Sequence, residues 1–283
     1  MIPPIAALAL LLVAGQPQAA PPAPPASGRP VTIGMSYEIA SAVLGGTRRI
    51  NVALPADYGE PGRRFRILYL LDGGEKEDFV HIAGLAAISA AYGQGEALIV
   101  VGIEGVDRRH DLTSPSSVAA DRARAPTAGG AAAYRRFLVD EVKPWVAAHF
   151  RTDGRSALIG ESLAGLFVLE TLLTAPDSFD DYIAVSPSLW WNGSRLAAET
   201  EADLRRGRFA GKRLFLASET PAPPPEAAAR ELRQQETVAN ALRGHAPPGL
   251  RATVVRLDEG HASIYHPAAW QAFRALYAAP APR

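Results

Sequence analysis

Ser162 is the residue of this chain whose surroundings point most directly to chemistry. It lies in the segment Ser156–Gly165, where an apolar run leads straight into a serine flanked by the small residues Gly160 and Ala164. A serine hydroxyl is a poor nucleophile unless the chain holds it exposed on a sharp strand-to-helix turn, and small neighbours let strand and helix approach closely. The segment therefore predicts a nucleophile elbow with Ser162 as the attacking group. The alternative for a G-x-S-x-x-G pattern alone is an ordinary turn whose serine caps a helix.

The patterns on both sides of Ser162 indicate the elements that must position it. Apolar residues after it recur at helical spacing and stop before Pro176, which predicts a helix. Nearly continuous apolar runs at 67–71 and 97–103 predict strands that are buried on both faces. Strand and helix patterns alternate along the rest of the chain, so we expect an α/β fold, a mostly parallel twisted sheet with helices on both faces.

Four further segments carry expectations about the surroundings of the site. Residues 107–130 are polar and contain Pro, Gly and Ser, so they are expected to form a long loop. Residues 131–150 and 226–243 are each expected to form one helix. The stretch 187–209 is too short for a large lid, which predicts an open cleft.

Composition excludes several classes of protein. The 283 residues are 48% hydrophobic and 20% charged, enough for one sizeable globular core. Lys+Arg and Asp+Glu both number 29, so a net charge of zero gives no field that favours nucleic acid. The absence of cysteine excludes disulfides, thiolate metal sites and a cysteine nucleophile. We therefore expect a small-molecule substrate with no nucleic-acid partner, metal or organic cofactor; the oligomeric state stays open.

The N-terminal residues resemble processing sequence rather than part of a fold. The apolar run 5–14 is too short to span a bilayer, and Ala- and Pro-rich residues follow it through position 30. This pattern predicts a signal peptide over 1–20, a spacer over 21–30 and a single folded domain over 31–279. The mature protein would then be periplasmic or secreted, with no integral membrane segment; the alternative is a tail that is never translocated.

A general base for Ser162 has to lie on the same edge of the sheet. Ligands bind beyond the carboxyl ends of the strands in such folds, so the base should follow a strand directly. Of the six histidines, His261 follows the last predicted strand, and Gly260 leaves its loop free to turn the ring toward the serine. His261 is therefore the preferred base. His266 is the reserve candidate, although its position at a helix start favours a capping role.

The other four histidines receive other assignments. His149 and His245 precede strands, which places them on the opposite edge of the sheet. His81 and His110 precede Ser162 and are left as candidates for lining the pocket. The chain order serine, acid, histidine favours a later base.

The acid that orients the base should also follow a strand. Glu219 lies just past a predicted strand and is preferred on that ground. Glu226 begins a helix, while Asp258 and Glu259 are too close to His261 along the chain to reach its far nitrogen easily. The alternative for Glu219 is a solvated loop carboxylate.

An oxyanion hole requires two backbone N–H groups that face the developing negative charge. The residue after the nucleophile, Leu163, should supply one of them. Gly74, in the Gly-Gly pair after the strand at 67–71, should supply the other, because glycine allows close approach of the backbone to a substrate. The alternative for the glycine pair is a tight turn.

Taken together, these segments resemble the Putative esterase family of α/β-hydrolases, which includes trilactone siderophore esterases, feruloyl and acetyl esterases, and mycolyltransferases. The resemblance covers roughly residues 36–277 and is carried by Tyr69–Gly74, Gly102–Ile103, Asp107–Thr113, Phe137–Pro144, the elbow, Ser186–Trp191 and Gly260–His261. It implies an α/β-hydrolase fold with Ser162 as nucleophile and His261 as base. It also implies Gly74 and Leu163 as the oxyanion donors.

The segment Ser186–Trp191 resembles the siderophore-esterase branch most closely. That resemblance implies Trp190 and Trp191 as aromatic walls of the pocket, with core packing as the alternative. Arg108 is expected to contact an anionic substrate or to form a loop salt bridge. Many relatives have His and Gly where this chain has Glu161 and Ala164. The acid is also less uniform in this branch, where a Ser–His pair can suffice.

The sequence thus predicts a serine hydrolase that cleaves carboxylic esters, of the siderophore-trilactone type, through an acyl-enzyme. An acyltransferase using the same residues is the alternative within enzymes, and a peptidase is not excluded. A non-catalytic binding module on the same fold is the alternative outside enzymes. The particular ester is not determined.

Overall fold

The computed structural model describes residues 28–220 and 225–278. The predicted signal peptide and residues 21–27 of the spacer lie outside the described residues. The chain divides into two compact units, Met1–Thr32 and Ile33–Arg283. Residues 28–32 of the first unit have no regular secondary structure, and the second unit contains all the elements that follow.

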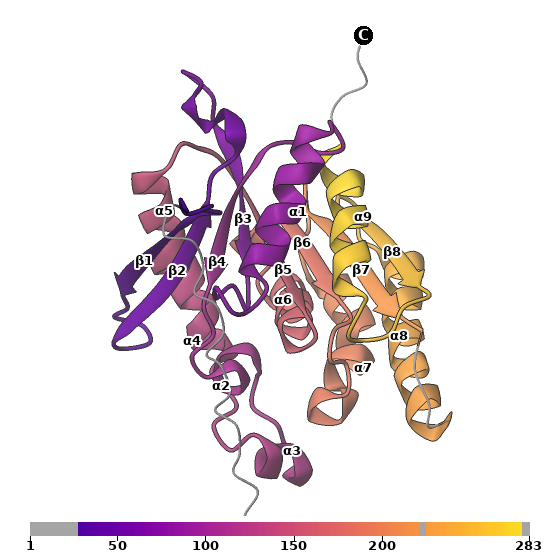
Figure 1. The fold of residues 1–283 in the computed structure, drawn as a ribbon. Helices are drawn as coiled ribbons and strands as arrows, with labels where there is room; N and C mark the ends of the chain where they lie inside the picture. Colours follow the sequence, from indigo (N-terminus) through magenta and orange to yellow (C-terminus); the bar gives the residue numbers. More distant parts are fainter. Residues whose placement is uncertain (1–27, 221–224, 279–283) are drawn as a thin grey trace, which may run out of the picture. The chain divides into compact units, whose positions relative to one another are not determined.

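An eight-stranded sheet forms the centre of the second unit, with the strand order β1-β2-β4-β3-β5-β6-β7-β8 (Figure 1). Strand β2 pairs antiparallel with both β1 and β4, and every later pair is parallel. The prediction of a mostly parallel sheet is confirmed. The strands are β1 (Met35–Ala40), β2 (Thr47–Ala53), β3 (Phe65–Leu70), β4 (Leu98–Ile103), β5 (Thr152–Glu161), β6 (Asp181–Val185), β7 (Arg213–Glu219) and β8 (Arg251–Leu257).

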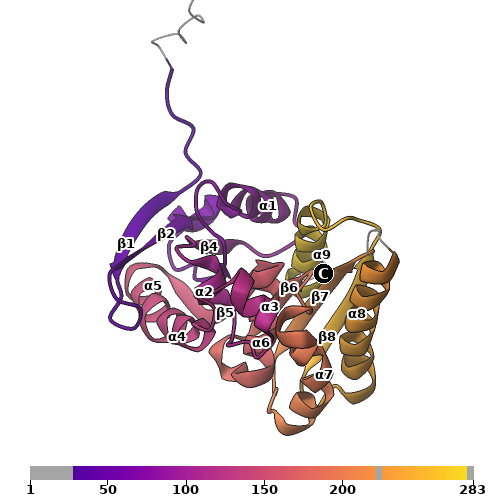
Figure 2. The same ribbon diagram turned by 90° about the horizontal axis from the view of Figure 1, so that it is seen from below.

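Helices cover both faces of this sheet (Figure 2). One face carries α1 (Phe79–Ala91) and α9 (Tyr265–Tyr277). The other face carries α4 (Ala131–Arg136), α5 (Lys143–His149), α6 (Leu163–Thr174), α7 (Trp191–Arg206) and α8 (Pro225–His245). Successive residues of β3 point to opposite faces, so that Tyr69 packs in one hydrophobic cluster and Leu70 in the other. The continuous apolar run of this strand is explained by burial on both sides.

Two expectations about secondary structure are wrong in part. The segment 107–130 is not a plain loop, because it contains α2 (Arg108–Leu112), capped by the Asp107 side chain, and α3 (Ala119–Arg124). The helix expected over 131–150 is interrupted by a π-helical turn, η2 (Phe137–Val142), between α4 and α5. Pro144 is the second residue after this turn, and its missing N–H removes one hydrogen bond of the regular helical ladder. Single 3₁₀ turns occur at η1 (Ala56–Gly59) and η3 (Pro176–Ser178).

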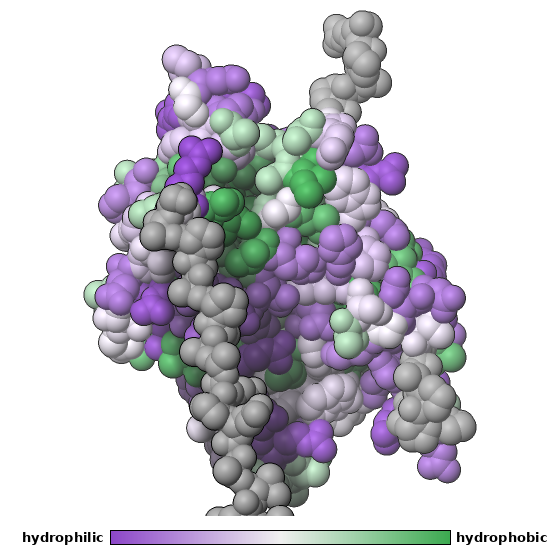
Figure 3. Space-filling model, viewed as in Figure 1, coloured by the Kyte–Doolittle hydropathy of each residue, from purple (hydrophilic) through white to green (hydrophobic). Residues whose placement is uncertain are grey.

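The surface has an apolar region near helix α1. Large exposed hydrophobic side chains include Leu54, Val80, Ile88 and Tyr92, and apolar patches are visible on the face that carries α1 (Figure 3). A hollow of about 690 Å³ in this region includes Leu54 and Ile88 and shares no lining residue with the pocket described below. Within the described residues, no helix is both long enough and apolar enough to span a membrane.

Candidate active site

Strained backbone marks one edge of the sheet. Asp72, Ser162 and Ser186 are non-glycine residues with positive φ angles of 51°, 61° and 43°, and they lie just beyond the carboxyl ends of β3, β5 and β6. L-residues rarely adopt such angles, and backbone strain of this kind is concentrated at functional sites. This edge of the sheet is therefore the candidate site, and it is the edge at which the sequence predicts the nucleophile, the base and the acid.

Ser162 occupies the sharp turn between β5 and α6. Its φ and ψ angles are 61° and −118°, and its N–H donates to the Val185 carbonyl at 3.0 Å. A Cβ on Gly160 would lie 2.6 Å from the Cβ of Ala164, and one on Gly165 would lie 2.5 Å from the Val185 oxygen. Glycine is required at both positions because strand and helix approach this closely. The turn presents the serine at the start of α6, as a nucleophile elbow does.

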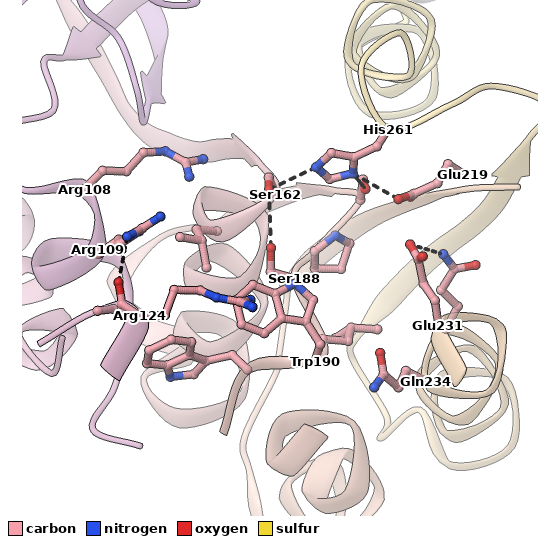
Figure 4. Close-up of a pocket in the computed structure, with 17 residues that line it drawn as sticks. Arg108, Arg109, Arg124, Ser162, Ser188, Trp190, Glu219, Glu231, Gln234 and His261 are labelled. Carbon is pink, nitrogen blue, oxygen red and sulfur yellow. Dashed lines mark hydrogen bonds and ion pairs between the residues drawn. The ribbon is translucent and has the colours of Figure 1, made fainter. Parts of the chain in front are cut away.

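Hydrogen bonds connect Ser162, His261 and Glu219 (Figure 4). Ser162 Oγ lies 3.1 Å from His261 Nε2, and His261 Nδ1 lies 3.0 Å from Glu219 Oε1. Glu219 is the last residue of β7, and His261 lies in the connection between β8 and α9. Parallel pairing of β5 through β8 brings these distant residues to one edge. The arrangement places a base against the serine and a carboxylate behind the base.

Two further serines join this network. Ser186 Oγ lies 2.7 Å from His261 Nδ1, and Ser188 Oγ lies 3.3 Å from Ser162 Oγ. Neither was singled out from the sequence as a site residue. Their position directly after β6, the strand next to the elbow strand, was the signal that could have identified them.

Carboxyl groups surround His261 and adjust its charge. Burial alone would raise the pKa of Glu219, but hydrogen bonds, with His261 first among them, hold that pKa at about 2. The hydrogen bond to Glu219 in turn raises the pKa of His261, and nearby Glu161 adds to this effect against the opposing effect of burial. Glu161 Oε1 lies 3.4 Å from His261 Nε2, and burial raises the pKa of Glu161 to about 7. Together these carboxyls stabilise the imidazolium that proton transfer from a serine would generate.

The two predicted oxyanion donors differ in their surroundings. Leu163 lines the pocket, and its N–H meets no acceptor among the described residues. Gly74 is not a lining residue, and its N–H donates to Glu77 Oε2 at 2.6 Å. The preceding Gly73 is fixed by hydrogen bonds to the Ile103 carbonyl and from the Asn51 side chain, both 2.8 Å long. The structure thus presents one free N–H group and one that is occupied by a side chain.

A pocket of about 500 Å³ opens above Ser162, a size typical of small-molecule sites, which occupy about 300–1,000 Å³. The described connection from β6 to α7 is only five residues long, 186–190, and holds no large lid. Basic side chains line one side of the pocket and acidic side chains the other (Figure 4). The polar and aromatic lining residues are Arg108, Arg109, Arg124, Ser162, Ser186, Ser188, Trp190, Trp191, Glu219, Glu231, Gln234, Gln235 and His261.

The two tryptophans have unequal roles in this lining. Trp190 is 39% exposed, and the Arg124 guanidinium lies 5.6 Å from its ring centre. Trp191 is only 4% exposed, and its indole N–H donates to the Ser114 carbonyl at 2.9 Å. Trp190 therefore forms an open wall, whereas most of Trp191 packs in the core. The predicted role as a pocket wall therefore applies to Trp190, and the alternative of core packing applies to Trp191.

Arg108 contacts both the elbow and the loop after β3. It forms a 2.8 Å ion pair with Asp72 and donates to the Glu161 carbonyl at 3.3 Å. This is the loop salt bridge expected as one of its two roles. The guanidinium also lines the pocket, so a bound anion would meet it there.

The remaining candidates lie outside the pocket lining, which includes neither His81 nor His110. His81 and His266 stack on each other with Nε2 and Nδ1 3.0 Å apart, so His266 pairs with another ring. His149 contacts the Trp145 carbonyl, and His245 lies 3.4 Å from Glu201. The alternative acids Glu226, Asp258 and Glu259 do not line the pocket. Among the described residues, no group of three or more potential ligands could hold a metal ion.

The mixed sheet with its single antiparallel strand, the elbow after β5 and the helices on both faces define an α/β-hydrolase fold. The family model described as "Putative esterase" matches residues 41–225. The chain belongs to this family.

Several characterised proteins are similar to this chain. Ferri-bacillibactin esterase BesA of Bacillus subtilis is 34% identical over 157 residues, which are 50% of this chain and 54% of BesA. Siderophore triacetylfusarinine C esterase of Aspergillus fumigatus is 34% identical over 147 residues, 48% of each chain. The crystal structure of an IroE-like serine hydrolase from Shewanella oneidensis superposes with a TM-score of 0.79 at 27% identity, covering 86% of this chain and 80% of that one. The chain spans about half the length of these two curated relatives.

Proposed function

We propose that this chain is a serine hydrolase that cleaves carboxylic esters through an acyl-enzyme. The observation that carries the proposal is the continuous hydrogen-bonded chain from Ser162 through His261 to Glu219 at the pocket. Membership in an esterase family supports it, and the matched residues 41–225 include the elbow. No metal or organic cofactor is required by this chemistry.

In the proposed reaction, Ser162 Oγ attacks the ester carbonyl while His261 Nε2 accepts its proton. Glu219 keeps the ring in the correct tautomer and stabilises the imidazolium. The N–H of Leu163 donates to the developing oxyanion, and that of Gly74 joins it once the Glu77 carboxylate has moved aside. His261 then protonates the leaving alcohol and later activates a water molecule that hydrolyses the acyl-enzyme.

The substrate class proposed is an ester of the siderophore-trilactone type. The similar proteins named above are esterases of ferri-bacillibactin and of triacetylfusarinine C. Arg124 over the ring of the exposed Trp190, together with Arg108 and Arg109 in the same lining, favours an acyl group that is aromatic or anionic. Because residues 1–20 are predicted to be a signal peptide, the proposal includes a periplasmic or secreted location for the mature protein.

Labelling by a fluorophosphonate probe, together with turnover of aryl acetates, feruloyl esters and a catecholate trilactone, tests the proposal. We expect labelling and turnover in the native chain and neither in Ser162→Ala, because truncation of a serine nucleophile removes on the order of 10⁶-fold in kcat. Ser188→Ala is the matched control for labelling, since it removes a pocket hydroxyl 3.3 Å away while the Ser162 hydroxyl remains to react with the probe. Labelling that persists in Ser162→Ala would overturn the assignment. Partitioning of the acyl-enzyme toward added alcohols would identify an acyltransferase.

Glu219→Gln tests whether the carboxylate is needed or a Ser–His pair suffices. We expect kcat to fall about 10³- to 10⁴-fold, because the amide stabilises neither the tautomer nor the imidazolium. The control is Glu259→Gln, a change on the loop of His261 outside the pocket lining. A fall of less than about tenfold would favour the two-residue mechanism.

A further inference from the structure

The carboxyl group of Glu219 has one oxygen in the His261 network and one outside it. Oε1 lies 3.0 Å from His261 Nδ1, whereas Oε2 is buried and meets no hydrogen-bond donor among the described residues. Buried acceptors in folded proteins almost always have a donor, and an unsatisfied one is destabilising. The proposed acid therefore lacks a partner at its second oxygen.

The group that faces Glu219 at this point is a second carboxyl, that of Glu231 on α8. The two side chains point toward each other across the acidic side of the pocket (Figure 4), and each carboxyl shifts the pKa of the other. Gln235, one turn further along α8, donates to Glu231 Oε1 at 3.5 Å. Glu231 is thus held beside Glu219 by its own helix.

Two carboxyl groups in contact form a hydrogen bond only when one of them carries a proton. With both ionised, neither oxygen is a donor and the two charges repel each other. The His261 ring faces Glu219, which favours ionisation there, whereas Glu231 has the uncharged Gln234 and Gln235 on its own helix. Burial and the neighbouring Glu219 raise the pKa of Glu231 to about 7, while the pKa of Glu219 stays at about 2. The shared proton therefore belongs on Glu231.

We propose that Glu231 is a positioning residue whose protonated carboxyl donates a hydrogen bond to Glu219 Oε2. It holds Glu219 as the ionised acceptor for His261 and satisfies its buried oxygen. This inference rests on the proposed function of Ser162 and His261 and adds a fourth member behind them. Nothing in the local sequence around Glu231 indicates this role, which depends on the packing of α8 against the end of β7.

In this arrangement the charge on Glu231 affects the protonation of His261. The charged and titratable groups that face Glu231 are Glu219 from β7 and His261 from the connection after β8, while the pocket arginines line the opposite side. Loss of the Glu231 proton adds a negative charge beside His261 and favours its protonated form. Because only neutral His261 accepts the serine proton, this coupling moves the acidic limb of kcat/KM to higher pH.

Two substitutions distinguish the hydrogen-bond donor that Glu231 supplies from the charge that it carries when ionised. Glu231→Gln keeps an N–H donor for Glu219 Oε2 but cannot ionise, so we expect turnover within about twofold of the native chain at neutral pH and an acidic limb at lower pH. Glu231→Ala removes the donor, and we expect a loss of roughly tenfold. Glu226→Gln, on an exposed position of the same helix outside the pocket lining, is the matched control and should change neither. Equal losses in Glu231→Gln and Glu231→Ala, or no loss in Glu231→Ala, would overturn the proposal.

Infrared difference spectroscopy supplies a readout that does not depend on turnover. At about pH 6, below the raised pKa of Glu231, we expect the native-minus-Glu231→Gln difference spectrum to contain a protonated carboxyl band, because the contribution of Glu161, whose pKa is also about 7, cancels. The native-minus-Glu226→Gln difference spectrum should lack this band. Absence of the band from the first difference spectrum would overturn the inference even in an active enzyme. If that difference spectrum instead contained the band but the native chain had no Ser162-dependent turnover, the proposed function would fail while the proton on Glu231 would stand.

Discussion

Two connections at the same edge of the sheet differ in how they present their backbone. The elbow, Gly160–Gly165, connects β5 with α6, and the glycine loop, Leu71–Asp78, follows the neighbouring strand β3. Both were expected to supply one N–H group to an oxyanion hole. At the elbow, Leu163 N–H lines the pocket without an acceptor, whereas in the glycine loop Gly74 N–H donates to Glu77.

This difference shows which features of a site depend on backbone and which on side chains. The elbow is held by a strained serine and by strand–helix contacts at Gly160 that leave no space for a Cβ. The glycine loop is equally close to its neighbours, but access to its N–H depends on the rotamer of Glu77. An exposed side chain can move, so we expect the elbow to be formed before substrate arrives and the loop to become competent only when Glu77 leaves.

Among substitutions that compare the two connections, Gly160→Ala is expected to have the largest effect. The new Cβ would lie 2.6 Å from the Cβ of Ala164 and 2.8 Å from its carbonyl carbon, so the start of α6 must shift. A displacement of about 1 Å at a reacting group can lower rates about 100-fold, and we expect at least that loss in kcat/KM with a lower Tm. Gly84→Ala on α1, where a Cβ meets nothing within 4 Å, is the control. Unchanged kcat/KM in Gly160→Ala would contradict a rigid elbow.

Gly73→Ala applies the same test to the glycine loop. Its Cβ would lie 2.3 Å from the Gly102 Cα, and we expect destabilisation of ~1–3 kcal/mol in denaturant unfolding. The loss in kcat/KM should be smaller, roughly tenfold, because Ser162 keeps its position while one oxyanion donor is displaced. A loss as large as that of Gly160→Ala would remove the distinction between the two connections.

Glu77→Ala should raise activity rather than lower it. The variant frees Gly74 N–H from the carboxylate that occupies it, and a hydrogen bond to a charged group is worth ~1.5–3 kcal/mol. Since loop ordering offsets part of this gain, we expect kcat/KM to rise about three- to tenfold, together with the affinity for a boronic acid transition-state analogue. Glu75→Ala, an exposed carboxylate on the same loop, is the control. If Glu77→Ala lowers both quantities, Gly74 is not the second donor.

The smallest effect is a pH shift from Glu161→Gln at the elbow. Glu161 contributes to the raised pKa of His261, so removing its charge lowers that pKa. The base must be neutral, and activity is lost as pH falls through the pKa of His261; the acidic limb of kcat/KM should therefore move to lower pH by about half a unit. Glu77→Gln should leave the limb in place. A shift to higher pH in Glu161→Gln would contradict the assigned coupling.

The fold was predictable because its signals are local and repeated. Continuous apolar runs such as 67–71 can be buried only inside a sheet covered on both faces, and the alternation with helices then requires parallel pairing. The short helix α2 was not predicted. Its capping hydrogen bond, from His110 N–H to the Asp107 side chain, spans three residues within a polar segment. The sheet-edge argument led to His261 and Glu219, and the structure places both within hydrogen-bond distance of their expected neighbours.

Other parts of the site had no local signal. Trp190 and Trp191 are adjacent and identical in type, yet one forms an open wall and the other packs in the core. Glu231 looks like any polar residue of an amphipathic helix until α8 is packed beside β7. The availability of Gly74 N–H depends on Glu77, a side chain that no turn pattern takes into account.

The sequence by itself determined the α/β architecture, the family resemblance and the turn at Ser162, because apolar periodicity and small residues act over a few positions of the chain. Only the tertiary structure decided which carboxyls surround His261, which tryptophan faces the pocket and which backbone N–H groups are free. These depend on distances between residues far apart in the chain, such as Ser162 and His261, which are 99 positions apart. Charge–charge coupling and burial act through space, so they exist only once the strands have been brought side by side.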